Sequence, residues 1–174
     1  MSGLVIRPVA AGDNASITRI YGDAVLNGTA SFEIEPPDDA EMMRRQRALL
    51  DGGYPYLVCE RAGTVVGYAY AGAYRPRPAY RFSVENSIYV ASHAHRQGIG
   101  RVLLERLIGE AEARGFRQMV AVIGDSAQAP SIELHHALGF RPVGTLQAVG
   151  FKHGRWLDTV LMQRPLGPGA ASAP

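Results

Sequence analysis

The stretch that most constrains the fold is residues 87–112, where an apolar strand, a glycine-bearing turn and an amphipathic helix follow one another. In its second half, four apolar residues recur at intervals of four: Ile99, Leu103, Leu107 and Ala111. Side chains with this spacing lie on one face of a helix. We therefore predict a strand ending near Val90, a turn, and a helix that packs its apolar face against a sheet.

The turn before this helix carries the chemical information. Gly98 and Gly100 leave the backbone unshielded where the helix begins, so that its first N–H groups have no partner within the helix. These donors and the positive end of the helix dipole suit a diphosphate, and Arg96 and Arg101 add charge beside them. The alternative is a turn whose glycines serve the conformation alone, because short glycine motifs often occur by chance. The third glycine of a Rossmann motif and the Gly-Lys-Ser/Thr of a P-loop are both missing.

Composition narrows the class of protein. A chain of 174 residues suits one domain with a core of its own. The net charge of +2 is too balanced to indicate binding to nucleic acid or membranes, and no apolar run reaches the length of a membrane span. The single cysteine, Cys59, cannot form an intrachain disulfide and fits a reducing compartment, so we expect a cytoplasmic protein.

Apolar runs, turn residues and helical periodicity divide the chain into alternating segments of one α/β domain over residues 1–166, with 167–174 as a disordered tail. Strands are expected at about residues 4–9, 56–60, 64–71, 84–90, 118–123, 141–149 and 156–163. Helices are expected at about residues 13–27, 38–50, 99–112 and 131–138.

These segments resemble the GNAT acetyltransferase superfamily, whose fingerprint is Arg/Gln-x-x-Gly-x-Gly/Ala. Gly98 and Gly100 fit the fingerprint, and His95 departs from its first position. Other segments resemble the phosphinothricin N-acetyltransferases, and nearly as closely the methionine sulfoximine/methionine sulfone acetyltransferases: residues 29–33, 68–72, 120–124 and 150–156. The resemblance implies a GNAT-like fold, with a mixed, mostly antiparallel central sheet of about seven strands flanked by about four helices.

The resemblance also implies a function. Acetyl-CoA would donate its acetyl group directly to the α-amino group of phosphinothricin or a similar small acidic amino-acid analogue, and the enzyme would be a homodimer. Methionine sulfoximine or methionine sulfone is the alternative substrate. A non-catalytic acyl-CoA-binding module is a third reading, supported by His95 and by Gln128, which stands where the superfamily often has a CoA-contacting asparagine.

By this resemblance, the backbone N–H of Val90 would meet the thioester carbonyl as part of an oxyanion hole. The full set of expected acetyl-CoA contacts is Ile88, Tyr89, Val90, His95, Arg96, Gln97, Gly98, Ile99, Gly100, Arg101, Gln128 and Ser131.

Two residues are the candidates for proton transfer. Glu85 interrupts an apolar strand, where burial would raise its pKa, and the phosphinothricin branch has a catalytic glutamate at this position. An exposed glutamate on an edge strand is the alternative. His135 precedes Gly139 by four residues, where the branch has a histidine that can act as an acid or a second base. A histidine on a helix surface is the alternative here.

Arg75, Arg77 and Tyr80 form the expected clamp for an acidic substrate, because guanidinium groups match carboxylate and phosphinate oxygens in bidentate geometry. A solvated basic loop is the alternative. Phe32 is expected to line the pocket for the substrate side chain. The chain has five histidines but no metal-binding spacing, so we expect no metal.

Overall fold

The computed structural model describes residues 3–174, and its order of strands and helices is the predicted one. The helices are α1 (Asn14–Asn27), α2 (Asp39–Asp51), α3 (Ile99–Ala113) and α4 (Ala129–Ala137). The strands are β1 (Leu4–Pro8), β2 (Tyr56–Arg61), β3 (Thr64–Ala73), β4 (Ser83–Val90), β5 (Gln118–Gly124), β6 (Arg141–Lys152) and β7 (Arg155–Pro165). The last two strands run longer than expected, because a tight turn at His153 and Gly154 joins them into one long hairpin.

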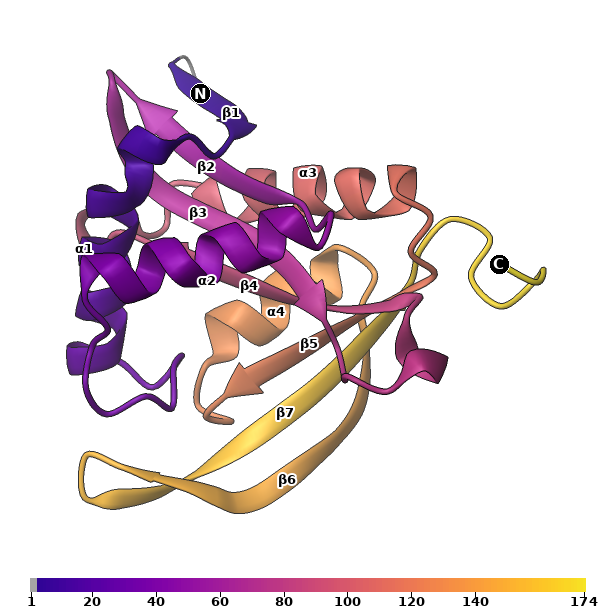
Figure 1. Ribbon diagram of the computed structural model, residues 1–174. Helices are drawn as coiled ribbons and strands as arrows, with labels where there is room; N and C mark the ends of the chain where they lie inside the picture. Colours follow the sequence, from indigo (N-terminus) through magenta and orange to yellow (C-terminus); the bar gives the residue numbers. More distant parts are fainter. Residues whose placement is uncertain (1–2) are drawn as a thin grey trace.

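The strands form one sheet in the order β1-β2-β3-β4-β5-β7-β6 (Figure 1). Every neighbouring pair is antiparallel except β4 and β5, which are parallel and are connected by the crossover helix α3. The prediction of a mixed, mostly antiparallel sheet is therefore confirmed. Pairing between β4 and β5 ends at Asn86 and Ala121, so that the two strands separate over 87–90 and 122–124.

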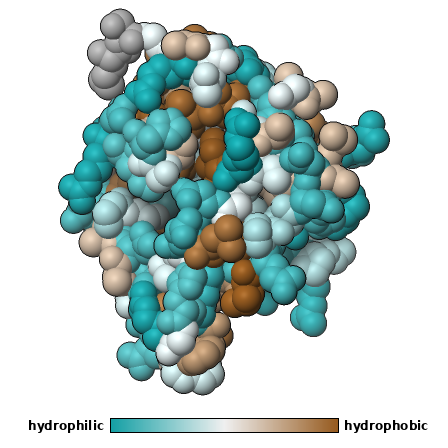
Figure 2. Space-filling view, turned by 90° about the vertical axis from the view of Figure 1, so that its left-hand side faces the viewer, coloured by the Kyte–Doolittle hydropathy of each residue, from teal (hydrophilic) through white to brown (hydrophobic). Residues whose placement is uncertain are grey.

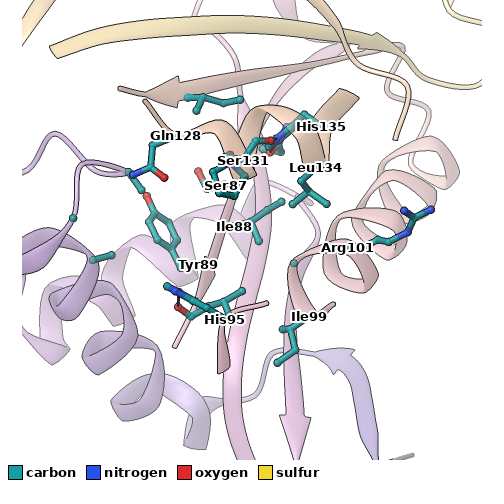
Figure 3. Close-up of a pocket in the computed structure, with 18 of the residues that line it drawn as sticks. Ser87, Ile88, Tyr89, His95, Ile99, Arg101, Gln128, Ser131, Leu134 and His135 are labelled. Atoms are coloured by element: carbon teal, nitrogen blue, oxygen red, sulfur yellow. Dashed lines mark hydrogen bonds between the residues drawn. The ribbon is translucent and has the colours of Figure 1, made fainter. Parts of the chain in front are cut away.

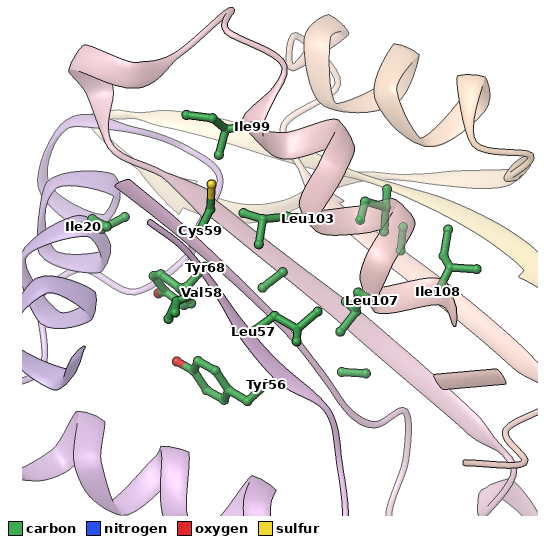
Figure 4. Close-up of a cluster of buried hydrophobic side chains, with 14 of the residues drawn as sticks. Ile20, Tyr56, Leu57, Val58, Cys59, Tyr68, Ile99, Leu103, Leu107 and Ile108 are labelled. Carbon is green, nitrogen blue, oxygen red and sulfur yellow. The ribbon is translucent and has the colours of Figure 1, made fainter. Parts of the chain in front are cut away.

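Helices cover both faces of the sheet: α1 and α2 lie on one face, and α3 and α4 on the other (Figure 1). Because side chains alternate along a strand, Val58 and Tyr68 point toward α1, whereas Cys59 points toward α3 (Figure 4). The predicted apolar face of α3 is buried along its whole length. Gly67 of β3 lets this helix approach closely, since a Cβ there would lie 3.1 Å from Cγ2 of Ile99.

Among the helices described, none is long and apolar enough to cross a membrane. On the side of the molecule that carries α1, hydrophobic side chains reach the surface among hydrophilic ones (Figure 2). The C-terminal segment follows the buried Leu166 and forms turns over 167–170, and the Arg117 side chain donates a hydrogen bond to the carbonyl of Ala173 at 3.1 Å. Disorder of this segment stays a prediction.

Candidate active site

The separation of β4 from β5 opens a cavity of about 620 Å³ in the middle of the sheet. Residues from both faces of β4 line this cavity, because β5 no longer pairs with β4 there and leaves both faces accessible. Figure 3 shows Ser87, Ile88 and Tyr89 of β4 around it, with Ser131 and His135 of α4. The cavity therefore joins the two sides of the sheet, and a long, thin molecule can pass between the strands.

The predicted turn lies at one end of this cavity. Gly98, which precedes α3, has a φ of +79°, a left-handed conformation that glycine adopts without strain. The backbone of Arg96 also adopts the left-handed conformation, with a φ of +58°. The first N–H groups of a 15-residue helix are thus free at the cavity rim beside Arg96 and Arg101. This geometry fits a diphosphate, and with the long cavity it fits acetyl-CoA.

His95 connects this turn to the strand. Its Nε2 lies 2.9 Å from the carbonyl oxygen of Val90, the last residue of β4 (Figure 3). The Gln97 side chain does not line the cavity: its amide donates to the His93 carbonyl at 3.2 Å and accepts from Arg61. The departure from the fingerprint at His95 therefore places a side chain that holds the strand end and the turn together.

Backbone donors of β4 point into the gap. The N–H of Ala91 donates to the Val66 carbonyl of β3 at 2.9 Å. Successive residues of a strand direct their N–H groups to opposite edges, so Val90 and Ile88 direct theirs away from β3. β5 has already separated at this point, which leaves both groups facing the cavity.

His135 is buried in α4, with 4% of its surface exposed, and both of its ring nitrogens face oxygen atoms. Nδ1 lies 2.8 Å from the Ser131 carbonyl, and Nε2 lies 3.0 Å from Oδ1 of Asn86. The Asn86 amide has a fixed orientation, because its Nδ2 donates to the Val120 carbonyl at 3.2 Å. A neutral imidazole carries one N–H and satisfies one of these acceptors, whereas a protonated ring would satisfy both.

Burial lowers the pKa of His135, and its hydrogen bond to the Ser131 carbonyl opposes this effect. The ring is therefore neutral at neutral pH, with one acceptor in place for a second proton. Asn86 supplies one of the two acceptors that face His135, and sequence reasoning did not assign it a role. The available signal was the polar run Glu85-Asn86-Ser87 inside an otherwise mostly apolar strand.

Glu85 lies just before the opening, opposite Val120 in the last paired part of β4 and β5. Its side chain is half-buried, and burial raises the pKa of this carboxyl above its ordinary value. None of the salt bridges found within residues 3–174 involves Glu85. A carboxylate in this setting is more basic than an exposed one, which is what proton abstraction from an ammonium group requires.

Several predicted residues lie outside the cavity lining. Arg75, Arg77 and Tyr80 are exposed on the loop between β3 and β4, at the end of the sheet where Glu85 lies. The guanidinium of Arg75 lies 5.3 Å from the ring centre of Tyr74, which packs edge-on against Tyr80. The loop thus presents two cations to solvent at the end of the sheet where Glu85 lies.

Phe32 lies on a connection between α1 and α2 that packs against the far end of β5. A Cβ on Gly124 would lie 2.8 Å from Cε1 of Phe32 and 2.5 Å from the carbonyl oxygen of Thr29. Gln128 is part of the same arrangement, since its amide donates to the hydroxyl of Thr29 at 3.0 Å. Gln128 also lines the cavity, as do Gly28 and Ala30 of this connection.

The structure thus gathers most of the predicted residues around one cavity: Ile88, Tyr89, Val90, His95, Arg96, Gly98, Ile99, Gly100, Arg101, Gln128, Ser131 and His135. It places the rest at the periphery: Phe32, Arg75, Arg77, Tyr80, Glu85 and Gln97. Their roles in binding and catalysis stay predictions. Within residues 3–174, no three His, Cys, Asp or Glu side chains are grouped so as to hold a metal ion.

The fold and the cavity are those of an acyl-CoA-dependent transferase. Comparison with known proteins identifies the family of transferases. The model of the acetyltransferase (GNAT) family matches residues 17–140, and this chain belongs to that family. It is an N-acetyltransferase.

Individual relatives match almost end to end. Phosphinothricin N-acetyltransferase of Alcaligenes faecalis is 53% identical over 169 residues, which cover 97% of this chain and 86% of that protein. L-methionine sulfoximine/L-methionine sulfone acetyltransferase of Salmonella typhimurium is 42% identical, covering 97% and 98%. The crystal structure of a phosphinothricin acetyltransferase from Sinorhizobium meliloti in complex with AcCoA superposes with a TM-score of 0.96 at 53% identity, covering 99% and 93% of the two chains.

The left-handed turn supports a prediction about acetyl-CoA. Replacing Gly98 by alanine introduces a Cβ at a φ of +79°, which costs about 1–2 kcal/mol in that conformation and shifts the N–H donors. We expect Gly98→Ala to raise the KM for acetyl-CoA about tenfold, the equivalent of 1.4 kcal/mol. Gly109→Ala in the same helix has no atoms near its added Cβ and should leave this KM unchanged. Equal effects of both variants would contradict the role of the turn.

Proposed function

We propose that this enzyme transfers the acetyl group of acetyl-CoA to the α-amino group of phosphinothricin or a similar small acidic amino-acid analogue. One observation carries the proposal: the opening between β4 and β5 has the left-handed glycine turn and the start of α3 at one end, and the half-buried carboxylate of Glu85, which forms no salt bridge within residues 3–174, lies just before its other end. The strands between them are the path for the pantetheine arm, and the amine approaches from the carboxylate side.

In this proposal, Glu85 removes a proton from the ammonium group, which frees the nitrogen lone pair to attack the thioester carbonyl carbon. The N–H of Val90 donates to the thioester oxygen as negative charge develops on it. His135, neutral before the reaction, accepts the second amine proton at a ring nitrogen and can return it to the departing thiolate. Acetyl-CoA supplies the activated acyl group and leaves as CoA.

The arginine loop supports an acidic substrate. Arg75 and Arg77 place two guanidinium groups at the Glu85 end of the sheet, and such groups bind carboxylate and phosphinate oxygens in pairs. Phe32 supplies an aromatic surface on the connection between α1 and α2, whose residues Gly28 and Ala30 line the cavity. Methionine sulfoximine or methionine sulfone is the second candidate, because the relative from Salmonella typhimurium is named for these amines and matches over 98% of its length.

Relative catalytic efficiency tests the substrate. We expect kcat/KM to be highest for phosphinothricin, lower for methionine sulfoximine and methionine sulfone, and lowest for unmodified methionine. Methionine matters as a control because it lacks the extra oxygen atoms that the two arginines would bind. A higher value for the sulfoximine would establish the second candidate, and equal values for all four amines would contradict selection by oxygen atoms.

We also propose that the enzyme is a cytoplasmic homodimer. The support for a dimer is a group of exposed apolar side chains on the β6–β7 hairpin: Val143, Leu146, Val149, Phe151 and Trp156. A patch of this kind is typical of a surface that binds protein. We expect sedimentation to give the mass of two chains, and Trp156→Asp to give the mass of one. A monomeric wild type would contradict the dimer. The buried free thiol of Cys59 fits a reducing cytoplasm, which cell fractionation tests.

A further inference from the structure

Lys152 is the single lysine among the 18 Lys and Arg side chains of this protein, and it is buried. It ends β6, with 4% of its surface exposed. Lysine is almost never fully buried without a partner, because its ammonium group loses strong hydration. All the other side chains of this set are arginines. Because the ammonium group of the one lysine is buried, we expect it to have a specific hydrogen-bond partner.

The contact is a backbone carbonyl far away in the sequence. Nζ of Lys152 donates to the carbonyl oxygen of Ser31 at 2.7 Å, and this is the one hydrogen bond of Nζ within the described chain. Burial lowers the pKa of Lys152, and the carboxylate of Glu33 opposes that effect. Glu33 itself accepts hydrogen bonds from Arg45 and Tyr21, so it is held in place near the ammonium.

Ser31 belongs to the connection between α1 and α2 that forms one wall of the cavity. Gly28 and Ala30, just before it, line the cavity, and Phe32 follows it. The same hairpin that carries Lys152 also receives the Phe32 ring, because a Cβ on Gly150 would overlap that ring. The end of β6 thus fixes two adjacent residues of this connection. It binds the Ser31 carbonyl through a charged hydrogen bond and packs against the Phe32 ring.

We propose that Lys152 is a positioning residue that holds residues 28–33, and with them Phe32, in place to receive the amine substrate. It acts through the Ser31 carbonyl and touches neither substrate nor acetyl-CoA. This inference rests on the proposed function. A lysine fits the position because its compact ammonium reaches one carbonyl at the end of a long, apolar stem, whereas a planar guanidinium needs more acceptors and more space.

The test separates a positioning role from stability alone. Lys152→Met removes the donor and keeps the stem. Asn14→Leu is its matched control, because buried Asn14 likewise donates one hydrogen bond to a distant carbonyl, that of Asp39 at 2.9 Å, away from the cavity. Both variants should melt at lower temperature. Lys152→Met alone should raise the KM for the amine about tenfold, because the released connection must be ordered again when the amine binds, with a smaller change in the KM for acetyl-CoA. An unchanged amine KM would overturn the proposal.

Hydrogen exchange gives a readout that needs no turnover. We expect backbone amides of residues 28–33 to exchange faster in Lys152→Met than in the wild type and in Asn14→Leu, and equal exchange would overturn the inference. A wild type that acetylates no amine would refute the proposed function, whereas the exchange result would still decide the role of Lys152. If Lys152→Met does not fold, the wild-type protein can be treated with a lysine-acylating reagent instead. Lys152 should then stay unmodified in the native protein. Modification at the rate of a free lysine would overturn the contact.

Discussion

Glu85→Gln is expected to lower kcat about 10²- to 10⁴-fold, the usual contribution of a general base, with little change in the KM for acetyl-CoA. The substitution keeps the size of the side chain and removes its basicity. The reason for a large effect lies in the setting of the carboxylate: it is half-buried beside the opened strands, and no arginine or lysine pairs with it within residues 3–174. Steady-state kinetics with both substrates varied gives the two constants separately.

The control is Glu105→Gln, an exposed glutamate on α3, which should keep full activity. The pH profile adds a second check. The base must be deprotonated to act, so kcat/KM falls as the pH drops through the pKa of Glu85. Because burial raises that pKa, the fall should occur at higher pH than for an exposed glutamate. Full turnover in Glu85→Gln, or an unchanged acidic limb in that variant, would remove Glu85 from the mechanism.

His135→Phe is expected to lower kcat about 10²-fold, at the lower end for a proton-transfer residue, with acetyl-CoA binding retained. Phenylalanine preserves the edge-on packing against Phe140, whose ring centre lies 4.9 Å from that of His135. It removes both ring nitrogens, so that the Ser131 carbonyl and Oδ1 of Asn86 lose their partner. The loss of a buried partner should also lower the melting temperature.

The neighbouring histidine provides the control for this variant. His136 is exposed on the same helix, and His136→Phe should leave kcat unchanged. Calorimetric titration with acetyl-CoA separates chemistry from binding, because a damaged fold would reduce both. Unchanged kcat in His135→Phe would show that the histidine is a structural part of α4 alone.

Local sequence signals predicted the elements well. The four-residue spacing that starts at Ile99 identified α3, and all four of the residues with this spacing are buried. Gly98 marked the left-handed turn, because glycine is the residue that adopts this conformation without strain. Both are properties of a few adjacent residues, and they do not depend on which other segments lie nearby.

Contacts between distant segments could not be predicted in the same way. Nothing near Lys152 in the sequence indicates that its ammonium reaches Ser31, 121 residues earlier. The pairing of Asn86 with His135 spans 49 residues, and it depends on the point at which β4 and β5 separate. Strand order and register determine these contacts, and both follow from the packing of the whole chain.

The central claim is acetyl transfer from acetyl-CoA to the amine of a small acidic amino-acid analogue. The most direct measurement incubates purified enzyme with acetyl-CoA and phosphinothricin, and follows both the released CoA thiol and the N-acetylated product by mass spectrometry. We predict that thiol and acetylated amine appear in equal amounts with the wild type, and that both appear about 10²- to 10⁴-fold more slowly with Glu85→Gln. Binding of acetyl-CoA without an acetylated product from phosphinothricin, methionine sulfoximine or methionine sulfone would contradict the claim.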